Sequence, residues 1–192
     1  QINAFALGAQ MTNPRAKVYL EWSTLKEQDI EKRIDEIDPN CISGKDIIVP
    51  DDNNHFYGVY HRESGGGEQK NLAMPLCHWG KFYEELIRTI MAGNWEQDND
   101  VEKAINYWWG MPTGVVDVIC SKKLPAGTVR LVNVLKHNYK TGQFHTFTDQ
   151  MYAQGHILKE KKGEKLSPEE VIEMDWLAEN IIGRIPKIEE LQ

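Results

Sequence analysis

The first sixty residues alternate between strand-like and helix-like patterns, and this order constrains the fold more than any other feature. Residues 17–22, KVYLEW, carry apolar side chains at every second position, which predicts a strand. Residues 25–38 then carry isoleucines at helical spacing, and short β-rich runs follow at 46–49 and 55–60. Strand–helix–strand order with short links favours an α/β fold in which helices flank a parallel sheet.

Further elements are predicted from breakers and caps. A helix over 3–12 ends at an Asn-Pro pair, and another over 79–92 ends at a glycine. Residues 127–135, GTVRLVNVL, are interpreted as a strand or as a strand followed by a helix. The last helix begins at Ser167, where Ser-Pro-Glu-Glu combines an N-cap, an early proline and a capping-box glutamate. Its apolar pattern predicts that it continues to residue 180 or 182 and stops at Gly183.

The length of 192 residues is sufficient for one domain with a hydrophobic core. We interpret 1–192 as a single domain fragment. Its parts are a strand–helix–strand portion over 1–62, a flexible connector over 63–71, and a helix, crossover and C-terminal helix over 72–192. The chain opens on QINAF without Met, so we interpret it as an internal piece of something longer, in which a signal, lipid anchor or upstream domain could precede residue 1.

The charge and motif content exclude several classes of function. A net charge of -7 argues against direct nucleic-acid binding, and no apolar run is long enough to cross a membrane. The six histidines lack the spacing of metal ligands, and no nucleophile elbow or phosphate-binding loop is present. We therefore expect no enzyme activity, catalytic residue, metal or cofactor. Cys41, Cys77 and Cys120 cannot all pair with one another and are interpreted as buried free thiols.

Aromatic side chains gather near the predicted strand ends and turns. They are Trp22, Tyr60, Trp79, Trp108 and Trp109. Ligands of open α/β sheets bind beyond the carboxyl ends of the strands, where rings can stack on planar groups. Two adjacent indoles cannot face the same way. We therefore expect one indole of INYWWGMPTG to pack against the sheet edge and the other to border a ligand cleft, without the sequence indicating which.

The stretch INAFALGAQMTNPRAKVYLEWS at 2–23 resembles the second lobe of the basic membrane protein family of ABC-transporter substrate-binding proteins. The later GVY, WGKFY, NYWWGMPTGVVDV and MDWLAENIIGRIP are similar to a divergent Gram-positive branch of that family. The resemblance covers nearly the whole chain, which corresponds to about the C-terminal half of a full-length member. It implies a type I periplasmic-binding-protein fold, here roughly the second lobe plus a C-terminal extension.

The resemblance also implies roles for particular residues. Trp22 takes the family position whose ring stacks on a nucleoside base. Tyr60 stands where the family has an aspartate that binds ribose hydroxyls, and Cys77, beside His78, replaces a basic residue. Because a phenol can donate one hydrogen bond but cannot accept the bidentate contacts of a diol as a carboxylate does, the polar contacts of the pocket have changed.

Together these features predict ligand-binding residues. Asp46, Tyr60 and His78 would supply polar contacts to a small planar polar solute, and Trp22 would stack on it. Trp79 and either Trp108 or Trp109 would form the walls.

The family implies a plasma-membrane-associated, extracytoplasmic lipoprotein that delivers its ligand to an ABC-transporter permease. The alternative is a cytoplasmic sensory or regulatory ligand-binding module related to transcription regulation.

Overall fold

The computed structural model describes residues 1–26, 28–44, 57–63, 69–93, 109–148, 150–160 and 165–191. They fall into two compact units. The first unit is discontinuous in sequence and combines residues 1–37 with 145–192, while the second spans 38–144. The interpretation of residues 1–192 as a single domain fragment stays a prediction.

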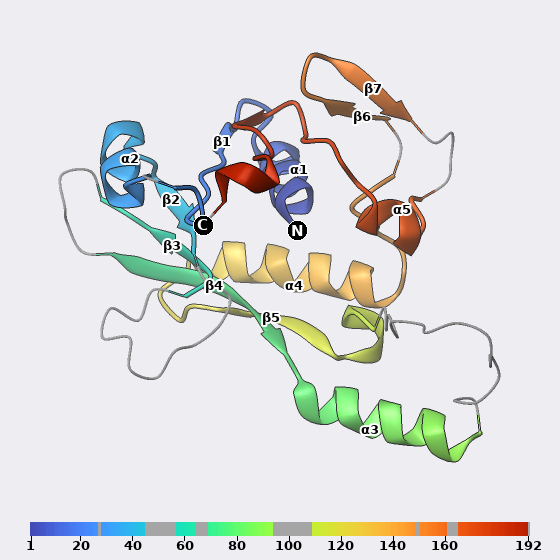
Figure 1. Cartoon of the computed structure of the whole chain (residues 1–192). Coiled ribbons are helices and arrows are strands. Elements are labelled where there is room, and N and C mark those ends of the chain that lie inside the picture. Colours follow the sequence, from blue (N-terminus) through green and yellow to red (C-terminus); the bar gives the residue numbers. More distant parts are fainter. Residues whose placement is uncertain are drawn as a thin grey trace. The chain divides into compact units, whose positions relative to one another are not determined.

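The first unit contains a parallel strand pair and a hairpin, and the hairpin is drawn in orange in Figure 1. Its elements are α1 (Ile2–Thr12), β1 (Val18–Tyr19), α2 (Ile30–Ile37), β6 (Gln150–Ala153), β7 (Ile157–Glu160), α5 (Pro168–Ile172), β8 (Ile181–Ile182) and the 3₁₀ turn η2 (Ile188–Glu190). β1 and β8 pair in parallel although they are distant in sequence, and β6 and β7 pair antiparallel. The parallel pair therefore depends on contacts between the two ends of the chain.

The core of the first unit is built from small and aliphatic side chains. It consists of Ala6, Leu177, Ala178 and Ile181. Asn3 lies beside this core, where its Oδ1 accepts a hydrogen bond from the Ala178 N–H at 2.9 Å. The Asn3 side-chain amide also donates to the Trp176 carbonyl oxygen at 2.7 Å. Because both partners are main-chain groups, Asn3 ties α1 to the segment that leads into β8.

The second unit contains an antiparallel sheet in the order β2-β3-β4-β5 (Figure 1). Its elements are β2 (Cys41–Ser43), β3 (Val59–His61), β4 (Lys70–Cys77), α3 (Trp79–Met91), the 3₁₀ turn η1 (Met111–Thr113), β5 (Val116–Cys120) and α4 (Ala126–Lys140). Lys136 fastens α4 to β5, since its Nζ lies 2.6 Å from the Asp117 carboxylate and 2.9 Å from the Val118 carbonyl oxygen. This ion pair lowers the pKa of the Asp117 carboxyl.

Several predicted elements are confirmed. The helices at 3–12 and 79–92 correspond to α1 and α3, and Gly93 ends the latter with a φ of 73°. The α/β class is also confirmed, with β1 and β8 as the parallel pair. The four-stranded sheet is antiparallel instead, because strands that follow one another in the chain pair directly.

Other predictions are wrong. Residues 127–135 contain no strand, because α4 runs unbroken from Ala126 to Lys140. The capping box at Ser167 is present, with its hydroxyl oxygen accepting from the Glu170 N–H, but α5 ends at Ile172. Of the residues that follow, Ala178 bridges to β6 and Ile181–Ile182 pair with β1, so contacts distant in sequence override the helical pattern.

The connector and the thiols also need correction. Lys70 and Asn71 belong to β4 and are not part of a flexible connector, while 64–68 lie outside the described residues. Cys41 and Cys77 are exposed rather than buried, because Cys41 begins β2 and Cys77 ends β4.

Candidate functional site

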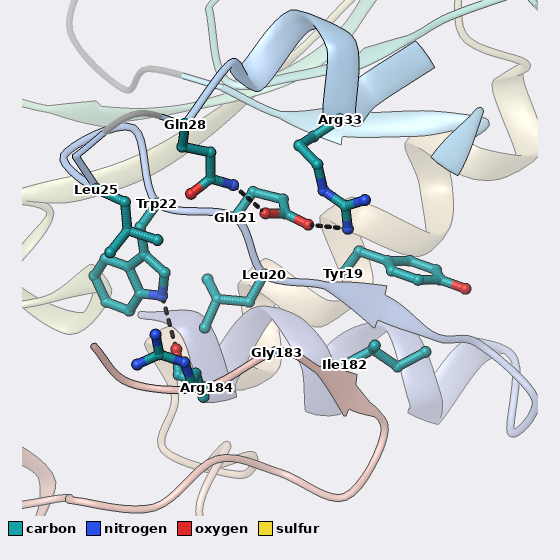
Figure 2. Close-up of a pocket in the computed structure, with 10 residues that line it drawn as sticks. All are labelled: Tyr19, Leu20, Glu21, Trp22, Leu25, Gln28, Arg33, Ile182, Gly183 and Arg184. Atoms are coloured by element: carbon teal, nitrogen blue, oxygen red, sulfur yellow. Dashed lines mark hydrogen bonds and ion pairs between the residues drawn. The ribbon is translucent and has the colours of Figure 1, made fainter. Parts of the chain in front are cut away.

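A pocket of about 230 Å³ opens where β1 and β8 end (Figure 2). It lies wholly within the first unit. Its lining residues are Tyr19, Leu20, Glu21, Trp22, Leu25, Gln28, Arg33, Ile182, Gly183 and Arg184. Because β1 and β8 are parallel, their carboxyl ends meet at one edge, which is where open α/β sheets bind ligands.

Trp22 supplies the largest ring of this pocket. Its indole N–H donates to the Arg184 carbonyl oxygen at 2.9 Å, as Figure 2 shows. The hydrogen bond fixes the ring in place and uses its one donor. Trp22 is half-buried, so it can offer a ligand an apolar ring surface but no further hydrogen bond from nitrogen.

The polar side of the pocket centres on Glu21. One carboxylate oxygen accepts from the Gln28 amide at 2.5 Å, and the other lies 3.1 Å from the Arg33 guanidinium (Figure 2). Arg33 also pairs with Glu36 at 2.6 Å. Hydrogen bonds to Glu36 and Glu21 raise the pKa of the Arg33 guanidinium above its ordinary value. Each of these charges is therefore balanced by an opposite charge beside it.

The charge of Arg184 is also balanced by a neighbouring carboxylate. Both of its terminal nitrogens bind the carboxylate of Glu190, one of them at 2.7 Å. The Glu190 carboxylate also accepts from the Lys187 main-chain N–H at 2.7 Å. The hydrogen bonds from Arg184 and from the Lys187 N–H lower the pKa of Glu190 from 4.5 to about 2. This bidentate ion pair between Arg184 and Glu190 stabilises the conformation of the chain that follows β8.

Acid is expected to weaken the ion pair between Arg184 and Glu190. Because the pKa of Glu190 is lower in the folded protein, its stabilising contribution is complete above about pH 4.5 and is lost as the pH falls through about 2. A carboxyl-carbon NMR titration measures the pKa directly. In Arg184→Gln the pKa should return towards its ordinary value, and an unchanged pKa in that variant would contradict the role of Arg184.

The sequence-predicted site residues occupy different parts of the chain. Trp22 lines the pocket of the first unit, whereas Tyr60, His78, Trp79 and Trp109 belong to the second unit. Asp46 and Trp108 lie outside the described residues. The two neighbours His78 and Trp79 stand at the start of α3, and Tyr60 lies on β3 opposite Asn71.

Phe82 brings two of the predicted residues together. Its ring meets Trp79 at 5.9 Å and Trp109 at 5.5 Å between centroids, both edge to face. Trp109 therefore packs against α3, while Trp79 keeps 60% of its surface exposed. One of Trp108 and Trp109 is expected to pack against the protein and the other to border a cleft. Trp109, the one that the structure describes, makes a packing contact.

Sequence reasoning missed the polar lining of the pocket. Glu21, Gln28, Arg33 and Arg184 were not among the predicted site residues. Glu21 immediately precedes the predicted stacking ring, which was a usable signal. Arg184 was hidden by the helix predicted up to Gly183, although Ile-Ile-Gly also fits a short strand followed by a turn.

Two known proteins are similar to this chain in sequence. A purine-binding protein of Brucella abortus (strain 2308) is 25% identical over 97% of this chain and 54% of its own length. A putative ABC transporter glucose-binding protein of Haloferax volcanii is 30% identical over 59% of this chain and 30% of its own length. The chain is similar to substrate-binding proteins. It spans about half the length of the first relative, and no protein-family model matches it.

Two further properties concern the described residues only. Among them, no group of three or more His, Cys, Asp or Glu side chains is arranged to hold a metal ion. No helix in the described part of the chain has the length and apolar character needed to cross a membrane.

Proposed function

We propose that the protein is the solute-binding component of an ABC-type uptake system, of the basic membrane protein type. The observation that carries this proposal is the pocket at the carboxyl ends of β1 and β8, with Trp22 on its wall. A small planar polar molecule, such as a purine nucleoside or its base, would stack on the indole. The similarity to a purine-binding protein supports this ligand class.

The charges of the pocket favour a neutral ligand. Arg33 and Arg184 both face carboxylates of the protein, at Glu21 and Glu190. An anionic ligand would have to compete with these carboxylates for the guanidinium groups. The volume of about 230 Å³ is below the range of drug-sized sites, which suits a molecule of one or two rings.

The same proposal extends to location and partners. The protein would be an extracytoplasmic lipoprotein at the plasma membrane that passes its ligand to a transporter permease and catalyses no reaction. Both relatives carry names of binding proteins, which favours solute uptake over the regulatory alternative. The other predicted ligand contacts stay predictions: they are Asp46, Tyr60, His78, Trp79, Trp108 and Trp109.

Isothermal titration calorimetry with adenosine, guanosine, adenine, hypoxanthine and glucose tests the proposal. We expect heat of binding with at least one purine compound. Trp22→Ala should weaken that binding about 10- to 100-fold, because stacking of one base on an aromatic ring contributes about 1–3 kcal/mol. No binding of any purine compound would contradict the proposed ligand class.

Two variants separate stacking from other effects of Trp22. Trp22→Phe keeps an aromatic face but loses the hydrogen bond to Arg184, so we expect an affinity between those of the wild type and Trp22→Ala. Tyr152→Ala removes a partly exposed aromatic ring from β6, in the same unit but away from the pocket lining. It should leave the affinity unchanged. Equal losses in Trp22→Ala and Tyr152→Ala would rule out a specific stacking role.

A further inference from the structure

One edge of β8 is bound by β1 and by Trp22. Alternate carbonyl oxygens along residues 180–184 point to this side, as the two-residue repeat of a strand requires. Each accepts a hydrogen bond at 2.9 Å: Asn180 from the Val18 N–H, Ile182 from the Leu20 N–H and Arg184 from the Trp22 indole. The indole thus takes the place that a third main-chain donor would have in the ladder.

On the opposite edge of β8, the side chain of Gln154 binds two main-chain carbonyl groups. Gln154 Nε2 lies 2.9 Å from the Ile181 carbonyl oxygen and 2.9 Å from the Gly183 carbonyl oxygen. Since both partners are acceptors, the amide nitrogen must face them. The two N–H groups of Gln154 therefore act where a neighbouring strand would otherwise donate.

Gln154 is itself held firmly. It follows β6, and its main-chain N–H donates to the Leu177 carbonyl oxygen at 2.9 Å. The preceding Ala153 is buried and forms an antiparallel bridge with Ala178. The side chain thus extends from a fixed backbone position towards the end of β8.

These contacts bear directly on the pocket. Ile182, Gly183 and Arg184 form one of its walls, and Gln154 binds the carbonyl groups on either side of Ile182. Gln154 does not line the pocket. It can therefore affect a ligand only by holding this wall.

We propose that Gln154 is a positioning residue of the pocket, whose side-chain amide fixes the end of β8 against β1 and thereby sets the distance between the Gly183–Arg184 wall and Trp22. The ligand-binding part of this inference rests on the proposed function. The positioning part depends only on the hydrogen bonds and can be measured without a ligand.

Gln154→Met tests the inference, because methionine has nearly the same length and volume but donates no hydrogen bond. The affinity for the purine compound that binds best should fall about tenfold, because binding would then have to order a wall that the two hydrogen bonds otherwise hold in place. The ¹H–¹⁵N resonance of the Trp22 indole, assigned by its absence in Trp22→Phe, should shift or broaden in the ligand-free protein. A role in packing alone would leave this resonance in place.

Gln143→Met is the matched control. Gln143 is exposed after α4, in the second unit, and the same substitution there should change neither affinity nor the Trp22 resonance. If Gln154→Met binds as tightly as the wild type, the inference is overturned while the proposed function stands. A loss of affinity with an unmoved indole resonance also overturns it, because Gln154 would then act by another route.

If the wild-type protein binds none of the compounds, the proposed function is refuted but the positioning role of Gln154 is not. The Trp22 resonance in Gln154→Met then decides the positioning role by itself. A shift supports it, and an unchanged resonance overturns it.

Discussion

Asn3→Ala should destabilise the first unit by about 2–5 kcal/mol. The substitution leaves the Ala178 N–H and the Trp176 carbonyl oxygen without the partners they now have at 2.9 and 2.7 Å. Asn3 is 6% exposed, so water cannot readily replace the amide. A buried main-chain group without a partner costs about 1–3 kcal/mol, and two such groups are affected. Urea denaturation followed by circular dichroism measures the loss.

An asparagine at the other end of α1 provides the control. Asn13 is exposed, and its Oδ1 accepts from the Arg15 N–H at 3.1 Å. Because water can replace that contact, Asn13→Ala should cost about 0.5 kcal/mol or less. Hydrogen exchange adds a local measurement, since the Ala178 amide should exchange faster in Asn3→Ala. Equal costs at the two positions would mean that Asn3 does not hold α1 to the segment before β8.

The same contacts explain which parts of the fold were predictable. α1 and α3 are set by local patterns and by breakers next to them in sequence, and these two helices were predicted correctly. Residues 173–182 also have a helical pattern, but Asn3 binds their main-chain groups and β1 pairs with their end. A partner more than 170 residues away leaves no local sign in the sequence. The last helix predicted from the sequence therefore extends beyond Ile172, where α5 ends.

The residues of the candidate site also divide into those that the local sequence predicts and those that depend on pairing between distant strands. The sequence predicts Trp22 as a site residue because it ends an alternating strand and because the resemblance to the basic membrane protein family implies a stacking position there. The residues opposite it, Gly183 and Arg184, come from the far end of the chain and meet Trp22 only when β1 and β8 pair. Their role follows from a parallel pairing between distant strands, which periodicity alone does not reveal.

Gly183→Ala should lower the stability of the first unit by about 2–5 kcal/mol and abolish ligand binding at the pocket. Gly183 has a φ of 147°, a conformation that other residues rarely adopt. A Cβ there would lie 2.8 Å from the Leu20 carbonyl oxygen and 2.9 Å from the Leu20 Cβ. Backbone strain of this kind and overpacking each cost about 1–3 kcal/mol. The end of β8 would have to move away from β1, and the pocket would open.

Gly155→Ala separates the cost of backbone strain from the cost of steric overpacking. Gly155 also has a positive φ, 76°, but no atom lies within 4 Å of the position that a Cβ would take. Alanine there should cost only the backbone strain of about 1–2 kcal/mol and leave ligand affinity unchanged. The difference between the two variants measures the close approach of Leu20 to Gly183. If the two losses of stability were equal, steric contact between β1 and β8 would not be what requires glycine at position 183.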